Sequence, residues 1–196
     1  MADGPVKGVR KARARQRLLN HFKKGGEGAE IGVHLGEFAV ELLSVVGPSR
    51  LHLIDPWRRL TGPTHKRALY GSHTSQQEMD ARHQAVADRF AREVAAGGVV
   101  IHRAFSVEAS TAFAPATLDF VYLDGDHSFE GTSADVAAWW PIVKPGGILA
   151  ADDYRIGGWW GAGVVDALRP LLAKSDAIVA FKDASQIAVQ KLEPGL

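Results

Sequence analysis

Short apolar runs alternate with longer amphipathic segments along this chain of 196 residues. Seven of the runs are predicted strands: residues 29–33, 51–54, 99–102, 118–123, 147–151, 177–181 and 186–190. A helix pattern over residues 37–46 stops at Gly47, and Met79, Val86 and Phe90 share one face at helical spacing. Strands separated by helices are typical of a parallel sheet with crossover connections.

The lengths of the connections predict the strand directions. Each of the first five strands is followed by a segment that can make a crossover, so we expect these strands to run parallel. The last two strands are joined by residues 182–185, a polar loop too short for a parallel crossover, so they should pair antiparallel. The sequence therefore predicts an α/β three-layer sandwich with a seven-stranded, mostly parallel sheet and an antiparallel last strand.

The composition is that of an ordinary globular domain, with 46% hydrophobic and 23% charged residues. The chain has no cysteine, which excludes disulfides, a cysteine-ligated zinc and a cysteine nucleophile. No apolar run approaches the roughly 18 residues of a membrane span. The first residues are polar and basic and lack an apolar signal core. We therefore expect a cytoplasmic protein without membrane contact.

Positive charge is concentrated at the start of the chain. Residues 1–24 carry eight Lys or Arg against one Asp, so with a net charge of +1 the remainder lies near −6. Such an arm could touch phosphates or an acidic ligand. The favoured interpretation is a solvated terminal helix whose Leu18, Leu19 and Phe22 pack on the domain. We accordingly divide the chain into a basic helix or arm, residues 1–27, and one domain, residues 28–196.

Glycines follow the first predicted strand. Gly32 and Gly36 would let the backbone turn sharply and approach a ligand. Their spacing departs from the dinucleotide fingerprint and from the phosphate-binding P-loop. Asp55 ends the second strand, where an acid grips a ribose diol in nucleotide-binding folds, although it could instead cap the turn. Trp57 offers a flat face to a ligand or is a core tryptophan.

Acidic residues follow two other strands. Asp124 and His127 come directly after residues 118–123, and Asp152 and Asp153 end the next strand. Carboxylates brought to one sheet edge repel one another unless a cation, a proton or hydrogen bonds offset their charge. Asp and His side chains there would suit Mg²⁺ or Mn²⁺. The alternative is that one acid caps a helix and the others are solvated.

Taken in order, these segments resemble a class I S-adenosylmethionine-dependent methyltransferase. The matching runs are Glu30-x-Gly32-x-x-x-Gly36, Leu-Ile-Asp55-Pro-Trp57, Ala104-Phe105-Ser106-x-Glu108, Tyr-Leu-Asp124-Gly-Asp126-His127-Ser-Phe, Lys-Pro-Gly-Gly and Asp152-Asp153-Tyr154. Within that superfamily the chain is similar to the small bacterial group with an Asp-Gly-Asp-His-Ser-Tyr signature, related to macrolide-sugar and catechol-type O-methyltransferases. The resemblance spans about residues 28–190 and implies a Rossmann-like fold.

The resemblance also implies the site residues. Those assigned to S-adenosylmethionine are Glu30, Gly32, Val33, Gly36, Asp55, Trp57, Phe105, Ser106, Asp124 and His127. In metal-dependent relatives the cation is held by acids that match Asp124, Asp152 and Asp153. The chain departs from them in having one extra residue between Asp124 and Asp152 and Phe129 in place of the usual Tyr. The basic arm lies outside the matching region, so removing residues 1–20 should leave cofactor affinity within a few-fold.

The expected reaction is O-methylation of a small hydroxylated acceptor, with Mg²⁺ or Mn²⁺ as a further cofactor. His127, beside Asp124, would carry the proton or serve as a structural hydrogen-bonder. The irregular 58–77 loop, with His65, Tyr70 and His73, and Tyr154 are the acceptor-contacting candidates. The alternatives are an RNA methyltransferase that uses the basic arm, a non-catalytic cofactor-binding protein, and a nicotinamide dehydrogenase. A nucleic-acid partner is not expected, and the acceptor's identity and a homo-oligomer stay open.

Overall fold

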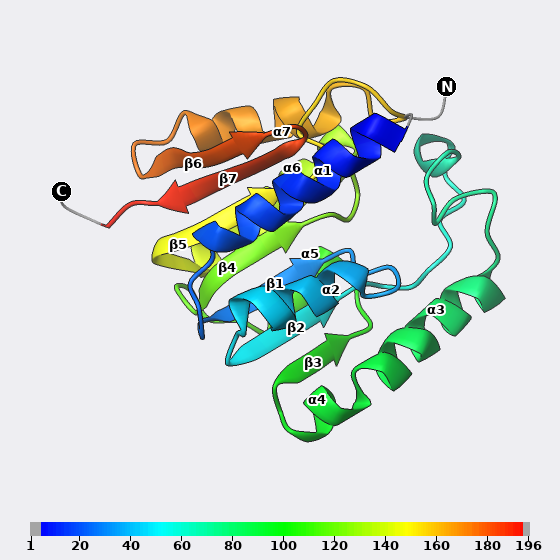
Figure 1. Ribbon diagram of the computed structural model, residues 1–196. Coiled ribbons are helices and arrows are strands. Elements are labelled where there is room, and N and C mark those ends of the chain that lie inside the picture. The colour runs from blue at the N-terminus through cyan, green and yellow to red at the C-terminus, as the bar shows by residue number, and fades with distance from the viewer. Residues whose placement is uncertain (1–4, 194–196) are drawn as a thin grey trace.

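The computed structural model describes residues 5–193 and contains one seven-stranded sheet (Figure 1). The strands are β1 (Glu27–Ile31), β2 (Arg50–Ile54), β3 (Val99–His102), β4 (Leu118–Leu123), β5 (Val143–Ala151), β6 (Ala177–Asp183) and β7 (Gln186–Lys191). Their order across the sheet is β3-β2-β1-β4-β5-β7-β6. The first five are parallel, and β7 is antiparallel to both β5 and β6. The predicted fold class and strand directions are confirmed.

Helices cover both faces of the sheet and complete the three layers (Figure 1). The helices are α1 (Pro5–Leu18), α2 (Glu37–Glu41), α3 (Gln76–Arg89), α4 (Ala91–Ala95), α5 (Ser106–Ser110), α6 (Phe129–Trp139) and α7 (Gly163–Leu172). On one face, Leu18, Phe38 and Phe90 from α1, α2 and the end of α3 share a core cluster. On the other face, Trp139 from α6 and Leu168 from α7 belong to a second cluster. The sheet therefore buries both of its faces, as a parallel sheet requires.

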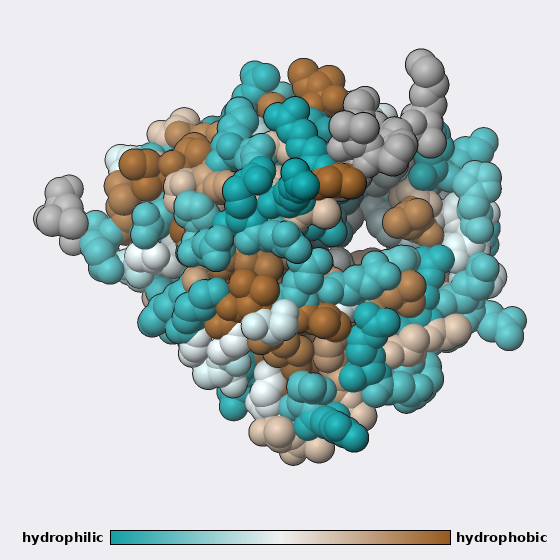
Figure 2. Space-filling model, viewed as in Figure 1, coloured by the Kyte–Doolittle hydropathy of each residue, from teal (hydrophilic) through white to brown (hydrophobic). Residues whose placement is uncertain are grey.

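Helix α1 is built into the core rather than attached to it. It lies across the sheet over β4, β5 and β7 (Figure 1). Leu18 and Leu19 are fully buried, and the Phe22 ring stacks on Phe120 with ring centroids 4.6 Å apart. This is the packing that the sequence predicts for these three apolar side chains. The outward side of α1 is hydrophilic (Figure 2).

Two elements differ from the sequence prediction in their extent. Strand β5 begins at Val143, four residues before the predicted start, because a register shift between Leu118 and Phe120 lets the Lys-Pro-Gly-Gly segment join the sheet. Gly146 permits this bulge with a left-handed φ of 78°. Helix α2 continues as a π-helical turn, Leu42–Val46, and ends at Gly47 as predicted. Short 3-10 turns occur at Leu19–His21, Pro63–His65 and Trp140–Ile142.

Within residues 5–193, no helix combines the length and the apolar character that a membrane span needs.

Candidate functional site

The candidate site lies at the edge of the sheet where the parallel strands end. In this strand order β1 and β4 are neighbours in the middle, with β2 and β5 beside them, so the loops after these four strands meet at one edge. Three of these loops contain a non-glycine residue with a left-handed backbone: His34 (φ 54°), Trp57 (φ 41°) and Asp153 (φ 52°). Such conformations are uncommon and cluster at functional sites.

The loop after β1 approaches its neighbours so closely that only glycine fits at two positions. At Gly32 (φ 87°), a Cβ atom would lie 2.3 Å from the backbone oxygen of Asp124. At Gly36 (φ 74°), it would lie 2.6 Å from the Phe90 ring. Between the two glycines, Val33 is buried in the core. The glycines thus let this loop pack directly against the end of β4, where the acidic residues begin.

Asp55 fastens that loop to the end of β2. Its Oδ2 accepts hydrogen bonds from the backbone N–H groups of Val33 and His34, both at 3.0 Å, and its Oδ1 accepts one from Trp57 at 2.7 Å. Burial raises the pKa of Asp55 despite these bonds. The Trp57 ring is fully buried, and its Nε1 donates to the His34 oxygen at 2.9 Å. Trp57 therefore occupies the position of a core tryptophan, the alternative that the sequence left open, and its ring offers no face to a ligand.

Glu30, at the end of β1, is a buried acid of a different kind. Only 2% of it is exposed, and its Oε2 has no hydrogen-bond partner among the described residues. Burial, reinforced by the Asp124 carboxylate, raises the pKa of Glu30 well above its ordinary value. A buried polar atom without a partner is unfavourable unless a ligand completes its bonding, so Glu30 is a strong candidate for a ligand contact.

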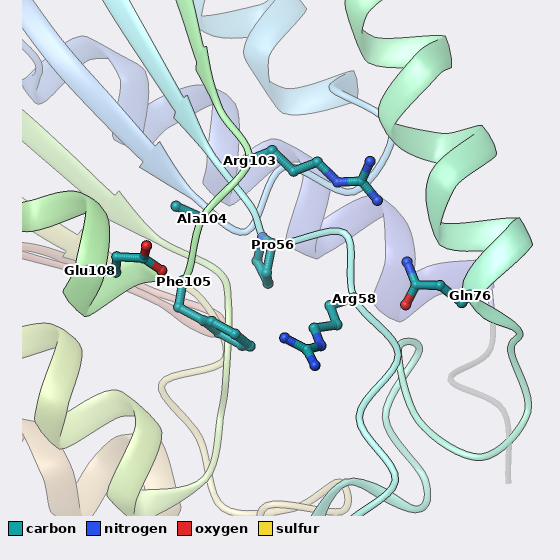
Figure 3. Close-up of a pocket in the computed structure, with 7 residues that line it drawn as sticks. All are labelled: Pro56, Arg58, Gln76, Arg103, Ala104, Phe105 and Glu108. Atoms are coloured by element: carbon teal, nitrogen blue, oxygen red, sulfur yellow. The ribbon is translucent and has the colours of Figure 1, made fainter.

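A pocket of about 430 Å³ opens beside the ends of β2 and β3. Figure 3 shows its lining residues: Pro56, Arg58, Gln76, Arg103, Ala104, Phe105 and Glu108. The Phe105 ring is 41% exposed, and the Arg58 guanidinium lies 6.0 Å from its centroid. Ser106 next to it is engaged elsewhere, because its hydroxyl accepts a hydrogen bond from Trp139 Nε1 at 2.8 Å. Phe105 rather than Ser106 is thus available to a flat ligand in this pocket.

At the ends of β4 and β5, the structure brings together the three predicted acids and three cations that the sequence analysis did not assign there. One is Arg155, whose Nε lies 3.5 Å from Asp153 Oδ1, and the other two come from α1. Arg15 Nη2 lies 2.5 Å from Asp124 Oδ2 and also contacts Asp152 Oδ2. Lys11 Nζ lies 2.9 Å from Asp152 Oδ2 and 3.1 Å from Asp153 Oδ1. The excess of basic residues at the start of the sequence includes Arg15 and Lys11, but the sequence does not show which acids these side chains contact.

The pKa values of Asp152 and Asp124 shift in opposite directions. Burial opposes the ionisation of Asp152, but Arg15 and Lys11 lower the pKa of Asp152 to about 2. Burial and the negative charge of Asp152 raise the pKa of Asp124 to about 6. The negative charge of Asp152 is thus offset mainly by cations of α1, one of the ways in which the sequence analysis expected adjacent carboxylates to be stabilised.

The predicted metal set does not fit this arrangement. Across residues 5–193, no group of three or more His, Asp or Glu side chains is placed to hold a metal ion. Asp152 Oδ1 already accepts hydrogen bonds from the Asp153 N–H, the Ser185 hydroxyl and the Gln186 amide, while its Oδ2 faces Arg15 and Lys11. As they stand, Asp124, Asp152 and Asp153 therefore do not fit the expected Mg²⁺ or Mn²⁺ site, because a guanidinium and an ammonium stand where the cation was expected.

His127 stands beside the acid cluster. Its Nε2 lies 3.3 Å from Asp124 Oδ1 and 3.9 Å from Asp153 Oδ2. Burial acts to lower the pKa of His127, but the carboxylates of Asp124, Asp153 and Asp152 together outweigh burial and raise that pKa above its ordinary value. His127 is therefore placed and tuned as a group that can hold a proton at this edge of the sheet.

A series of aromatic rings leads from His127 to Tyr70. Ring centroids lie 5.1 Å apart for His127 and Trp160, 6.0 Å for Trp160 and Trp159, 5.9 Å for Trp159 and His65, and 5.7 Å for His65 and Tyr70. Asp126 holds His65, with Nε2 2.8 Å from Oδ2. The sequence analysis missed the two tryptophans, whose signal is the Gly-Gly-Trp-Trp-Gly segment after β5.

The two remaining acceptor candidates lie elsewhere. His73 is exposed, and the Tyr154 ring packs beneath Lys182 Nζ at 5.0 Å, next to the turn between β6 and β7. The surface is hollowed between the 58–77 loop and the rest of the molecule (Figure 2). The described site therefore combines three parts. They are the pocket at Phe105, the glycine loop (residues 32–36) next to Glu30, and the acid cluster (Asp124, Asp152 and Asp153), which lies beside His127 and an aromatic wall formed by Trp159 and Trp160.

Comparisons with known proteins point to one family. A family model described as a methyltransferase domain matches residues 29–154. A candidate rRNA methylase structure from Clostridium thermocellum aligns over 95% of this chain and 97% of its own, with a TM-score of 0.66 and 14% identity. A candidate caffeoyl-CoA O-methyltransferase from Staphylococcus aureus aligns over 97% and 85%, with a TM-score of 0.61 and 14% identity. The N-methyltransferase NodS from Bradyrhizobium japonicum WM9 aligns over 98% and 100%, with a TM-score of 0.61 and 16% identity. At these identities the structures establish the fold, and none of the curated proteins matches the chain in sequence.

Proposed function

This chain belongs to the methyltransferase domain family, and from that premise we propose that it transfers a methyl group from S-adenosylmethionine to a hydroxyl group of a small acceptor. The proposal includes membership of the group with the Asp-Gly-Asp-His-Ser-Tyr signature, of which residues 124–128 carry all but the last position.

The observation that carries the proposal is Glu30. A buried acid with an unsatisfied oxygen, held next to the glycine loop, fits a ligand that brings polar groups to the end of β1. S-adenosylmethionine has such groups in its ribose hydroxyls and its methionine amine. Gly32 lets the loop after β1 lie directly against the Asp124 backbone, so that the loop and the end of β4 form one continuous edge beside Glu30.

The pocket at Phe105 supports the same ligand. It opens at the ends of β2 and β3, one strand position away from Glu30 on β1. A flat adenine ring would pack on the exposed face of Phe105, with the Arg58 guanidinium close by. Glu30, at the end of β1 between this pocket and β4, would then hold the ribose or methionine part.

When bound, S-adenosylmethionine would supply an electrophilic sulfonium methyl group to the acceptor oxygen and would leave as S-adenosylhomocysteine. The chain's own part is to orient the acceptor and take its proton. His127 Nε2 accepts that proton from the hydroxyl, and Asp124, 3.3 Å away, stabilises the resulting imidazolium.

The aromatic wall supports a ring-shaped acceptor. Trp159 and Trp160 present flat apolar surfaces next to His127. Tyr70 Oη and Trp160 Nε1 are buried and, among the described residues, have no hydrogen-bond partner. A phenol or a sugar ring would pack on these faces and bring polar groups to the two unpaired atoms.

An RNA acceptor is less well supported. Of the basic residues in the arm, Lys11, Arg15, Arg17 and Lys23 already contact acids of the same chain. Arg15 and Lys11, the less exposed of the four, are therefore engaged with the acid cluster and are not free to bind phosphates.

The test is ligand-dependent stability followed by methyl transfer. We expect S-adenosylhomocysteine to raise the melting temperature, since a ligand at 100 times its Kd stabilises by about 2.7 kcal/mol. NADH should leave it unchanged. Radiolabelled S-adenosylmethionine should then methylate a phenolic or sugar acceptor, faster at pH 8 than at pH 6, because the raised pKa of His127 leaves less of the neutral base at the lower pH.

Two variants separate binding from chemistry. Glu30→Gln should weaken the stabilisation by S-adenosylhomocysteine, whereas His127→Gln should keep it and lose most of the transfer. Stabilisation by NADH alone would replace the proposal with a dehydrogenase. Cofactor binding without transfer to any hydroxylated acceptor would replace it with a non-catalytic binding protein.

A further inference from the structure

We propose that Arg15 and Lys11 of α1 are part of the active site and supply to Asp124, Asp152 and Asp153 the positive charge that a divalent cation would otherwise supply. With α1 in place, these acids do not bind Mg²⁺ or Mn²⁺. The charge assignment stands without the proposed function; only its consequence for methyl transfer rests on that function.

The position of Arg15 is set by the packing of α1. Ala14, next to it, and Leu18, one turn further on, are both fully buried. The Arg15 guanidinium lies 5.3 Å from the centroid of Phe38 and 6.0 Å from that of Tyr122, and its side chain is only 25% exposed. Since the helix and the two rings hold the guanidinium, its contact with the acids is not a chance pairing of mobile surface side chains.

Asp152 is held in the orientation that receives these cations. Tyr122 Oη donates to Gln186 Oε1 at 3.1 Å, and the Gln186 amide donates to Asp152 Oδ1. With Oδ1 turned toward β7 by this chain of bonds, Oδ2 is left facing Arg15 and Lys11. A metal ion at Asp152 would have to displace these contacts, and the side chain itself is completely buried.

The charges also oppose a metal ion. Arg15 stays protonated at any physiological pH, and two cations within 3.1 Å of the acids would repel an arriving dication strongly in a partly buried site. His127, on the other side of Asp124 and Asp153, adds a further positive charge whenever it is protonated. Under the proposed function, the fixed charge of Arg15, which contacts the same Asp124 carboxylate as His127, favours an acceptor oxygen that is losing its proton.

The experiment is a Mn²⁺ titration followed by electron paramagnetic resonance, with no cofactor or acceptor present. It compares the wild-type protein with Arg15→Gln/Lys11→Gln and with Arg10→Gln/Arg13→Gln, two exposed residues of the same helix that give the same change in charge. We expect only the Arg15→Gln/Lys11→Gln protein to gain a saturable site, with a Kd at least about tenfold below that of the other two, or ~1.4 kcal/mol.

Two results overturn the proposal. One is a stoichiometric Mn²⁺ site in the wild-type protein that Asp152→Asn removes. The other is a folded Arg15→Gln/Lys11→Gln protein that binds no more Mn²⁺ than the control. If that protein does not fold, Lys11→Gln alone must still bind Mn²⁺ more tightly than wild type, and failure to do so overturns the proposal too. Absence of methyl transfer with the expected Mn²⁺ pattern would refute the proposed function and leave this inference standing.

Discussion

Asp55 stabilises the backbone of two loops even without a ligand. Both of its oxygens accept hydrogen bonds from backbone N–H groups, at 2.7–3.0 Å, and these bonds tie the loops after β1 and β2 together. The sequence predicts a ribose contact at this position, with a turn-capping role as the alternative. The geometry supports the capping role directly and leaves the ribose contact as a prediction.

We predict that Asp55→Asn destabilises the ligand-free protein. The amide keeps one acceptor oxygen, so at least one charge-assisted bond, worth about 1.5–3 kcal/mol, is lost. Urea denaturation without cofactor should show a loss of about 2 kcal/mol. Asp88→Asn, on the exposed side of α3, is the matched control and should change stability little. Equal stability of Asp55→Asn and wild type would mean that the carboxylate acts only on the ligand.

At the scale of elements, α6 carries a buried acid that the reaction does not use. Helix α6 begins after Ser128, whose hydroxyl accepts a hydrogen bond from the Gly131 N–H at 3.0 Å. Asp135, further along, is 6% exposed, and burial raises its pKa to about 7. The helix therefore holds an acid that is protonated in the folded protein at pH values where the unfolded chain would have released the proton.

This shift predicts how α6 responds to pH. The folded-state pKa lies above the ordinary value of 3.8, so the folded protein binds the extra proton and its stability falls as the pH rises from about 4 to about 7. Asp135→Asn removes this loss. Relative to wild type, the variant should gain on the order of 2–4 kcal/mol in unfolding free energy between pH 5 and pH 8.

Urea denaturation of both proteins at the two pH values measures this gain, and comparing the proteins cancels the contributions of other groups, such as Glu30. Glu130→Gln, at the exposed start of the same helix, is the control and should show no pH-dependent difference. A stability difference between wild type and Asp135→Asn that is the same at pH 5 and pH 8 would mean that the pKa of Asp135 is not raised.

At the scale of the whole molecule, α1 closes one face of the sheet and reaches the site from a distant part of the sequence. Its apolar side belongs to the same core cluster as α2 and the end of α3, and its basic side meets the ends of β4 and β5. Stability and the charge of the site therefore depend on the same helix.

We predict that deleting residues 1–20 severely destabilises the protein, in contrast to the expectation from sequence that the arm is dispensable for cofactor binding. The deletion removes Leu18 and Leu19, both fully buried, and each buried leucine contributes about 1.5–3 kcal/mol. Thermal denaturation should show a large fall in melting temperature. In the full chain, Leu18→Ala should lose about 2–5 kcal/mol, whereas Val9→Ala, 52% exposed, should change little. A truncated protein as stable as wild type would show that α1 is not part of the core.

The strands, their directions and the loops that meet at the site could all be predicted from the amino-acid sequence. Short continuous apolar runs mark the strands because both faces of the sheet are buried, so successive residues of a strand are apolar. The connection lengths decide which pairs can be parallel. The turn formed by Gly32 and Gly36 could be predicted because both positions combine a left-handed φ with neighbours too close for a side chain, and only glycine meets both conditions. The acids after β4 and β5 could be assigned to one edge for the same topological reason.

The cations that face those acids could not be predicted, because their position depends on how the folded chain packs. Arg15 and Lys11 are more than 100 residues away from Asp124 and Asp152, and the path of α1 across the sheet brings them together. The burial of Trp57 and the aromatic wall of Trp159 and Trp160 likewise depend on contacts between separate loops. Local pattern encodes which residues are apolar, charged or flexible, whereas the partner of a charge depends on the packing of the whole chain.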